Sequence, residues 1–151
     1  MRKLEISELN RIDADKYRQS EKLPVIVILD NVRSLYNIGS VFRTSDAFRI
    51  EKIMLCGITA TPDNSLTEIH KTALGAENTV EWEYCKETKE AVLKLKSDGY
   101  VAIAVEQVVG SNKLDYYEIP FSKYALIFGN EVKGVQQEVV DICEKSLEIP
   151  Q

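Results

Sequence analysis

The sequence has few of the residues that build disulfide frameworks or metal sites. It contains three cysteines (Cys56, Cys85 and Cys143), with no close pair among them, and one histidine, His70. These counts argue against a disulfide framework, a zinc knuckle or another metal site, and they favour reduced thiols in the cytoplasm. No apolar run approaches the roughly 20 residues that span a bilayer. The start, Met1–Glu5, lacks an apolar signal region, so we expect neither a membrane partner nor secretion.

Two common nucleotide-binding signatures are also missing. The chain has no G-x-G-x-x-G, which disfavours a common dinucleotide-binding fold. The glycine-bounded loop 129–134 fails the Walker pattern because Lys133 precedes the second glycine and no Ser or Thr follows it. A nucleotide-binding α/β protein that uses another ligand stays open as an alternative.

Positive charge is in deficit overall but not everywhere. The chain has 19 Lys and Arg against 24 Asp and Glu, a net charge of -5. Residues 1–52 hold ten basic and eight acidic residues, whereas residues 53–151 hold nine and sixteen. Because local patches govern nucleic-acid binding, the basic N-terminal third is the candidate region for such a partner. Chance explains the net charge of +2 in residues 1–52 equally well.

The apolar pattern predicts strands that alternate with helices in one domain of 151 residues. The expected strands are 24–29, 52–56, 79–84, 100–105, 124–128 and 146–150, and the expected helices are 37–48, 65–73, 86–97 and 135–144. A further amphipathic helix is expected at 4–18, with Ser7 as a possible N-cap, packed on the domain. This alternation is typical of an α/β fold whose mostly parallel sheet carries helices on both faces.

The most informative stretch, residues 30–49, runs from a buried strand through a loop into a helix. Arg43 follows Gly39 by four positions, so we expect the glycine to leave open space in front of the arginine. Arg43 would then reach an anionic group held at the helix start. The alternative is that Arg43 is a surface residue that forms an ion pair with Asp46. The residues expected to face inward are Ile38, Val41, Phe42 and Phe48.

A second glycine-bearing loop, Phe128–Val135, also follows a buried strand and precedes a helix. It carries an amide, Asn130, and a carboxylate, Glu131. Because parallel strands end at one edge of a sheet, this loop should lie near residues 30–39 and 105–107 and form a small-molecule pocket there. The alternative is that this loop is an ordinary turn between a strand and a helix and forms no pocket.

Three motifs together resemble a known family. The segment Asn37-x-Gly39-x-x-x-Arg43-Thr44 resembles the first motif of the SpoU (TrmH-type) RNA ribose methyltransferases of the SPOUT superfamily. Gly129-Asn130-Glu131-x-x-Gly134 resembles their second motif, and Ile149-Pro150 the opening of their third. The resemblance covers residues 24–151, which leaves residues 1–23 as an N-terminal helical extension.

The resemblance implies methyl transfer from S-adenosyl-L-methionine to a ribose 2′-hydroxyl of tRNA or rRNA. It also implies a homodimer and a trefoil-knotted sheet. Arg43 would be catalytic, and so would Asn37, which shapes the RNA site. The residues that would bind the cofactor are Val105, Glu106, Gly129, Asn130, Glu131, Gly134 and Ile149. Glu131 would also support the dimer, and Arg33, ahead of the helix, is either a phosphate ligand or a solvated loop charge.

The third motif of the family continues past Ile149-Pro150 through a glycine to a Ser-Leu-Asn segment and a final helix. Those residues supply a catalytic serine, an asparagine and the tail of the knot. The sequence stops at Gln151, so we expect residues 24–151 to lack this C-terminal part and the knot to be incomplete. The alternative function is a non-catalytic RNA-binding module that kept the SPOUT fold.

Overall fold

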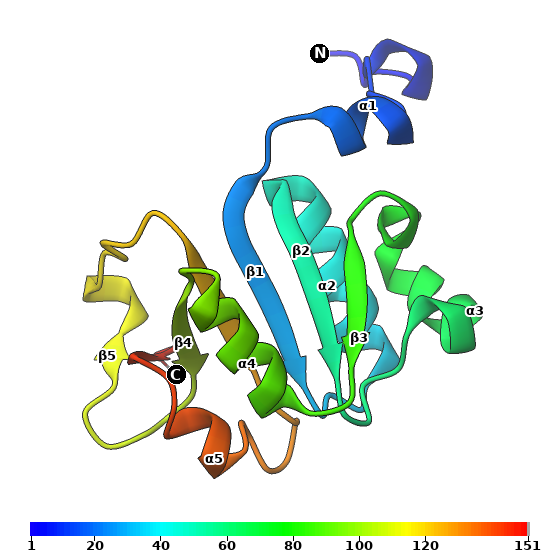
Figure 1. Ribbon diagram of the computed structural model, residues 1–151. Coiled ribbons are helices and arrows are strands. Elements are labelled where there is room, and N and C mark those ends of the chain that lie inside the picture. Colours follow the sequence, from blue (N-terminus) through cyan, green and yellow to red (C-terminus); the bar gives the residue numbers. More distant parts are fainter. Residues whose placement is uncertain (151) are drawn as a thin grey trace.

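The alternating strands and helices build one parallel sheet in the computed structural model, which describes residues 1–150 (Figure 1). The strand order is β3-β2-β1-β6-β4-β7-β5, and every strand pair is parallel. The strands are β1 (Leu23–Asp30), β2 (Ile50–Cys56), β3 (Trp82–Cys85), β4 (Val101–Val105), β5 (Asn112–Lys113), β6 (Tyr124–Phe128) and β7 (Lys145–Glu148). The helices are α1 (Ala14–Gln19), α2 (Leu35–Phe48), α3 (Pro62–Ala73), α4 (Thr88–Ser97) and α5 (Gln137–Val140).

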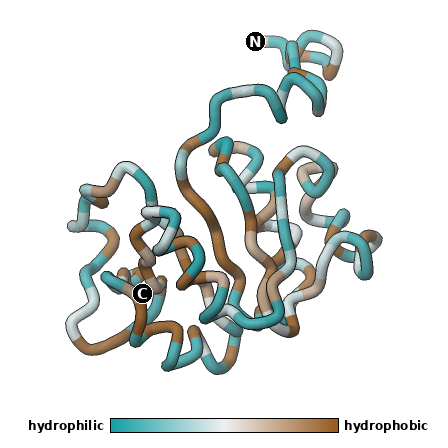
Figure 2. Tube along the Cα trace, viewed as in Figure 1, coloured by the Kyte–Doolittle hydropathy of each residue, from teal (hydrophilic) through white to brown (hydrophobic). Residues whose placement is uncertain are grey.

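Two apolar layers cover the sheet, one on each face. Successive side chains of a strand point to opposite faces, so β1 contributes to both layers. Ile26 and Ile28 pack with α4 and α5, whereas Val27 and Leu29 pack with α2 and α3. Figure 2 shows the corresponding hydrophobic run along β1. The predicted fold class, a parallel sheet with helices on both faces, is confirmed, while the knot stays a prediction.

The strand order reverses next to β1. From β1 the chain moves outward to β2 and β3, and it then returns to the other side, where β6 pairs directly with β1. Open α/β sheets bind ligands beyond the carboxyl ends of the strands at such a reversal. The loops after β1 and β6 therefore flank the place where this fold favours a site.

The predicted helix at 4–18 is wrong. A 3₁₀ turn at Ile6–Glu8 contains Ser7, and helix α1 begins only at Ala14. Asn10 has a left-handed backbone with φ of 45° and interrupts any continuous helix. Asp13 then caps α1, because its carboxylate accepts the Lys16 N–H at 2.8 Å. The aliphatic residues on which the prediction relied are exposed: Leu4, Ile6, Leu9 and Ile12.

Three smaller expectations also differ from the structure. The predicted helix at 135–144 shortens to α5, and the two-residue strand β5, which pairs with β7, had no sequence signal. Phe48 does not face the core: it is 64% exposed and borders an apolar cavity that Leu126 and Phe128 also line. The remaining predicted strands and helices lie within three residues of the observed ones.

Candidate functional site

The loops after β1 and β6 form a strand-end junction, which we define as Asp30–Asn37 together with Gly129–Gln136. Strands β1 and β6 are in register, with Leu29 opposite Phe128, so both chains leave the sheet side by side. Ser34 caps α2 by accepting the Asn37 N–H at 3.2 Å. The sequence therefore places two turns, each at the entrance to a helix, against one another.

Asp30 links the two loops of the junction through hydrogen bonds of its buried carboxylate. Its carboxylate has no exposed surface and accepts the Thr88 hydroxyl at 2.6 Å. It also accepts the Gln136 N–H and the Gln136 side-chain amide, both at 2.8 Å. Asp30 thus joins β1 to the start of α4 and to the end of the second loop, which fixes how the loops lie against each other.

The second loop is a closed turn rather than an open cradle. Asn130 and Gly134 exchange two backbone hydrogen bonds, of 3.0 and 2.9 Å. The Asn130 amide donates to Asn31 O at 2.8 Å and accepts the Val132 and Lys133 N–H groups. A Cβ added to Gly129 would lie 2.1 Å from the Gly134 backbone, so close backbone packing requires glycine there.

Glu131 occupies the N-terminus of α2. Its carboxylate accepts the Arg33 N–H at 3.1 Å, the Ser34 N–H at 2.9 Å and the Asn37 side-chain amide at 3.2 Å. Burial raises the pKa of this carboxyl, but the hydrogen bonds from Ser34 and Arg33 outweigh it, so the pKa lies below its usual value. The anion at the helix start is therefore the chain's own carboxylate.

The other residues predicted to bind the cofactor gather at the neighbouring strand ends. Val105 lies opposite Phe128 on one side and Leu147 on the other. The Glu106 N–H donates to Leu147 O at 2.9 Å, and its carboxylate accepts the Val135 N–H at 2.8 Å. Gly129, Val105 and Ile149 thus follow or end three adjacent strands at one edge, which we call the cofactor edge.

The first loop and the second loop also enclose a cavity of about 450 Å³. Two cations, Arg33 and Lys133, line it beside Asn31, Asn130 and Gln136. Neither cationic side chain has an ion-pair partner among residues 1–150. This is the setting in which Arg33 would contact an anion.

The expectation about Gly39 is wrong. Gly39 is buried, and a Cβ there would lie 2.1 Å from the Thr72 hydroxyl oxygen and 2.3 Å from Ile69 O. The glycine lets α3 pack closely on α2, so α3 fills the space beside Gly39. Arg43 also forms no ion pair with Asp46 or Glu131 within residues 1–150, so the plain alternative of an Asp46 pair is not observed either.

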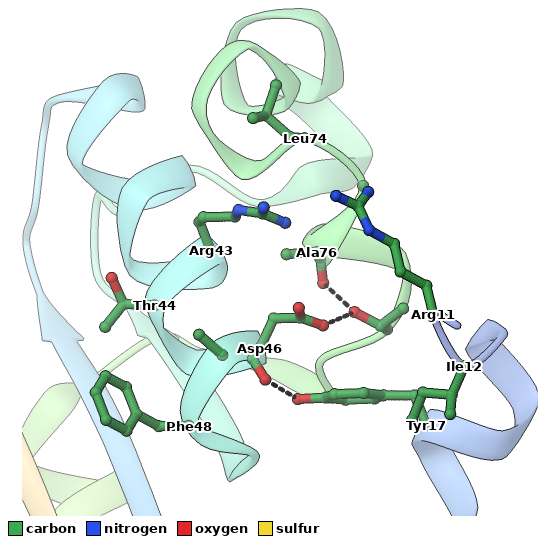
Figure 3. Close-up of a pocket in the computed structure, with 12 residues that line it drawn as sticks. Arg11, Ile12, Tyr17, Arg43, Thr44, Asp46, Phe48, Leu74 and Ala76 are labelled. Atoms are coloured by element: carbon green, nitrogen blue, oxygen red, sulfur yellow. Dashed lines mark hydrogen bonds between the residues drawn. The ribbon is translucent and has the colours of Figure 1, made fainter. Parts of the chain in front are cut away.

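Arg43 instead lines a cavity of about 610 Å³, which we call the two-arginine pocket (Figure 3). The pocket lies between the C-terminal half of α2, the segment after α3 and the N-terminal segment, which contributes Arg11 and Tyr17. Sequence reasoning missed Arg11. The basic excess of residues 1–52 was the only signal that pointed toward it.

Residues 1–150 contain neither a cluster of metal ligands nor a membrane-spanning helix. No group of three or more His, Cys, Asp or Glu side chains lies close enough together to hold a metal ion. None of the described helices has the length and apolar character needed to cross a membrane. The single histidine, His70, bonds through Nδ1 to the buried carboxylate of Glu77.

Comparisons with known proteins agree with this architecture. The model of the SpoU rRNA Methylase family matches residues 24–151. An uncharacterized tRNA/rRNA methyltransferase of Mycoplasma genitalium is 28% identical over 89% of this chain and 55% of its own length. A tRNA (guanosine(18)-2′-O)-methyltransferase of Aquifex aeolicus is 26% identical over 83% of this chain and 58% of its own length.

A crystal structure of an AdoMet-bound rRNA methyltransferase from Sinorhizobium meliloti superposes with a TM-score of 0.76 and 24% identity, covering 89% of this chain and 51% of that one. The chain spans little more than half the length of the curated relatives it matches. The family match covers most of the sequence and contains the first two motifs and the opening of the third. The chain belongs to the SpoU rRNA methylase family.

Proposed function

We propose that the protein methylates a ribose 2′-hydroxyl of tRNA or rRNA with S-adenosyl-L-methionine as the donor. The observation that carries this proposal is the cofactor edge, where three neighbouring parallel strands end together in a chain of this family. The names of the relatives support RNA as the methyl acceptor. The unpaired thiols of Cys56, Cys85 and Cys143 are consistent with a reaction in the cytoplasm.

The residues at the cofactor edge fit a ligand with both an apolar ring and polar groups. Ile149 is 52% exposed and, directly after β7, offers an apolar surface next to the end of β4. Val105, Glu106, Gly129, Gly134 and Ile149 would hold the cofactor. Asn130 and Glu131 would act by fixing the loop shape, because their side chains already bond within the junction. Bound S-adenosyl-L-methionine supplies an electrophilic methyl group.

Arg43 would act on the RNA rather than on the donor. An arginine side chain is no ordinary general base. Arg43 would bind a backbone phosphate and stabilise the negative charge that develops on the ribose oxygen as its proton passes to that phosphate. Asn37 and Arg33, at the start of α2, would position the RNA beside it.

We further propose a homodimer. Arg43 and the 129–136 loop line separate cavities of one chain, and Arg43 lies six residues, about 9 Å, further along α2 than Asn37. A second copy would bring its Arg43 to the first copy's cofactor edge. The apolar cavity bordered by Phe48, Leu126 and Phe128 offers surface for such a copy to bury.

Mapping ribose methylation in RNA from a strain that lacks the gene tests the proposal. We expect one 2′-O-methyl group of tRNA or rRNA to disappear and to return when the gene is restored. An unchanged methylation map, with the purified protein still binding RNA, would instead favour the non-catalytic RNA-binding module.

A further inference from the structure

Arg11 and Arg43 are two cations that share one cavity without a partner. Arg2 and Arg18 pair with Glu8 and Asp15, whereas the guanidinium groups of Arg11 and Arg43 form no ion pair or hydrogen bond with a residue of the described chain, 1–150. Both line the two-arginine pocket, and Figure 3 shows their guanidinium groups facing the same space.

A buried tyrosine docks helix α1, which follows Arg11 in the chain, beside this pocket. Tyr17, on α1, is only 6% exposed, and its hydroxyl donates to Asp46 O at 2.9 Å near the end of α2. Arg18 donates to Asn78 O at 2.7 Å. These two contacts dock α1 on the domain, and Asp13 caps that helix two residues after Arg11. The N-terminal segment is therefore attached where it can add a charge to the Arg43 site.

The charges of the pocket favour an anionic ligand. Two guanidinium groups in one cavity repel each other unless an anion lies between them. Asp46 is the one acidic residue that lines the pocket, and its carboxylate already accepts the Thr79 hydroxyl at 2.7 Å. Guanidinium forks match the oxygens of a phosphate in pairs.

The size and the walls of the pocket favour a nucleotide unit over a free anion. A cavity of about 610 Å³ is far larger than one phosphate group requires. Ile12 and Leu74 are exposed apolar residues of its lining, available to a sugar or a base. A phosphodiester with its attached ribose meets both requirements at once.

We propose that Arg11 and Arg43 form a clamp that binds a backbone phosphate of the RNA substrate, which makes residues 1–23 part of the RNA site. This inference rests on the proposed function, because it assumes RNA as the ligand. Arg11 brings a positive charge to the phosphate, so its loss weakens RNA binding at low salt more than at high salt.

The test is a binding titration at several salt concentrations, with two probes: bulk tRNA and fragmented rRNA, each from a strain that lacks the gene. Arg11→Ala should weaken binding of the preferred probe about tenfold at low salt and reduce the salt slope by about one phosphate equivalent. Arg11→Lys should keep the slope and lose part of the affinity, because lysine lacks the fork. Lys16→Ala is the matched control: it removes one charge from α1 outside the pocket and should change little.

The outcomes separate the two proposals. If the wild-type protein binds and methylates RNA while Arg11→Ala binds with unchanged affinity and slope, the clamp is wrong and the proposed function stands. If the wild-type protein binds neither probe and methylates neither, both proposals are wrong. If Arg11→Ala changes the oligomeric state but not RNA affinity, the pocket is an interface between copies and the clamp is again overturned.

Discussion

The strand-end junction and the two-arginine pocket differ in whether their charged side chains have partners within the chain. In the junction the carboxylate of Asp30 accepts four hydrogen bonds from the chain itself, and that of Glu131 accepts three. In the pocket, Arg11 and Arg43 have no such partner within residues 1–150. The comparison indicates that the carboxylates of the junction build its geometry, whereas the two arginines of the pocket are left for a ligand.

The largest expected effect is at Asp30. Asp30→Ala should lower the free energy of unfolding by about 3–5 kcal/mol, because it leaves the buried Thr88 hydroxyl and the Gln136 donors without an acceptor. Denaturant unfolding measures this change. Asp141→Ala, at an exposed acid of the same fold, should cost no more than about 0.5 kcal/mol. Equal losses in the two variants would mean that Asp30 has no special part in the junction.

Arg43 should show the reverse pattern, with an effect on activity but not on stability. Arg43→Ala should lower methyl transfer about 100- to 1,000-fold, the usual cost of losing one group that stabilises developing negative charge. Its unfolding curve should match that of the wild type, because Arg43 forms no ion pair within the described residues. A correctly folded Arg43→Ala protein with near wild-type activity would contradict the catalytic assignment.

A substitution at Gly39 tests helix packing alone, because alanine adds a methyl group without changing the charge of the protein. Gly39→Ala should destabilise the protein by about 1–3 kcal/mol, because the added Cβ would collide with Thr72 and Ile69 O and push α3 away from α2. Ser40→Ala, the exposed neighbour on the same helix, should stay within about 0.5 kcal/mol in thermal unfolding. If the two alanine variants were equally stable, close packing of α2 on α3 would not depend on this glycine.

The smallest expected effect concerns Glu131 and pH. Its pKa is lower in the folded chain than in the unfolded one, so it stabilises the fold above the unfolded pKa of about 4.3. That contribution is lost as pH falls through the folded pKa. Glu131→Gln should therefore flatten part of the decline in stability below about pH 4.3, with a loss under about 1 kcal/mol at neutral pH. Identical acid profiles of wild type and Glu131→Gln would show that the carboxylate does not stabilise the start of α2.

The sequence predicts the layers of this fold well because they depend on local apolar patterns. The run Val25–Leu29 is a strand in any parallel sheet, and it lies in β1 as expected. Strand β5 has no such pattern, because Asn112 and Lys113 become a strand only through pairing with β7. Phe48 was misplaced for a similar reason: helical periodicity does not tell whether another element covers the end of α2.

The candidate site was harder to predict than the fold. Parallel strand ends allowed Gly129 and Val105 to be placed at one edge, and the family resemblance added Ile149, although their roles stay predictions. Arg11 could not be predicted as a site residue, because its position depends on a hydrogen bond between Tyr17 and Asp46, which lie 29 residues apart. Contacts of this kind leave no periodic signal in a single sequence.

The most direct test of the account is transfer of a labelled methyl group from S-adenosyl-L-methionine to RNA from a strain that lacks the gene, followed by digestion to nucleosides. The account predicts label on the 2′-oxygen of one nucleoside with the wild-type protein and a loss of about 100-fold or more with Arg43→Ala. Label on a base, or no label on RNA that the protein binds, would contradict it.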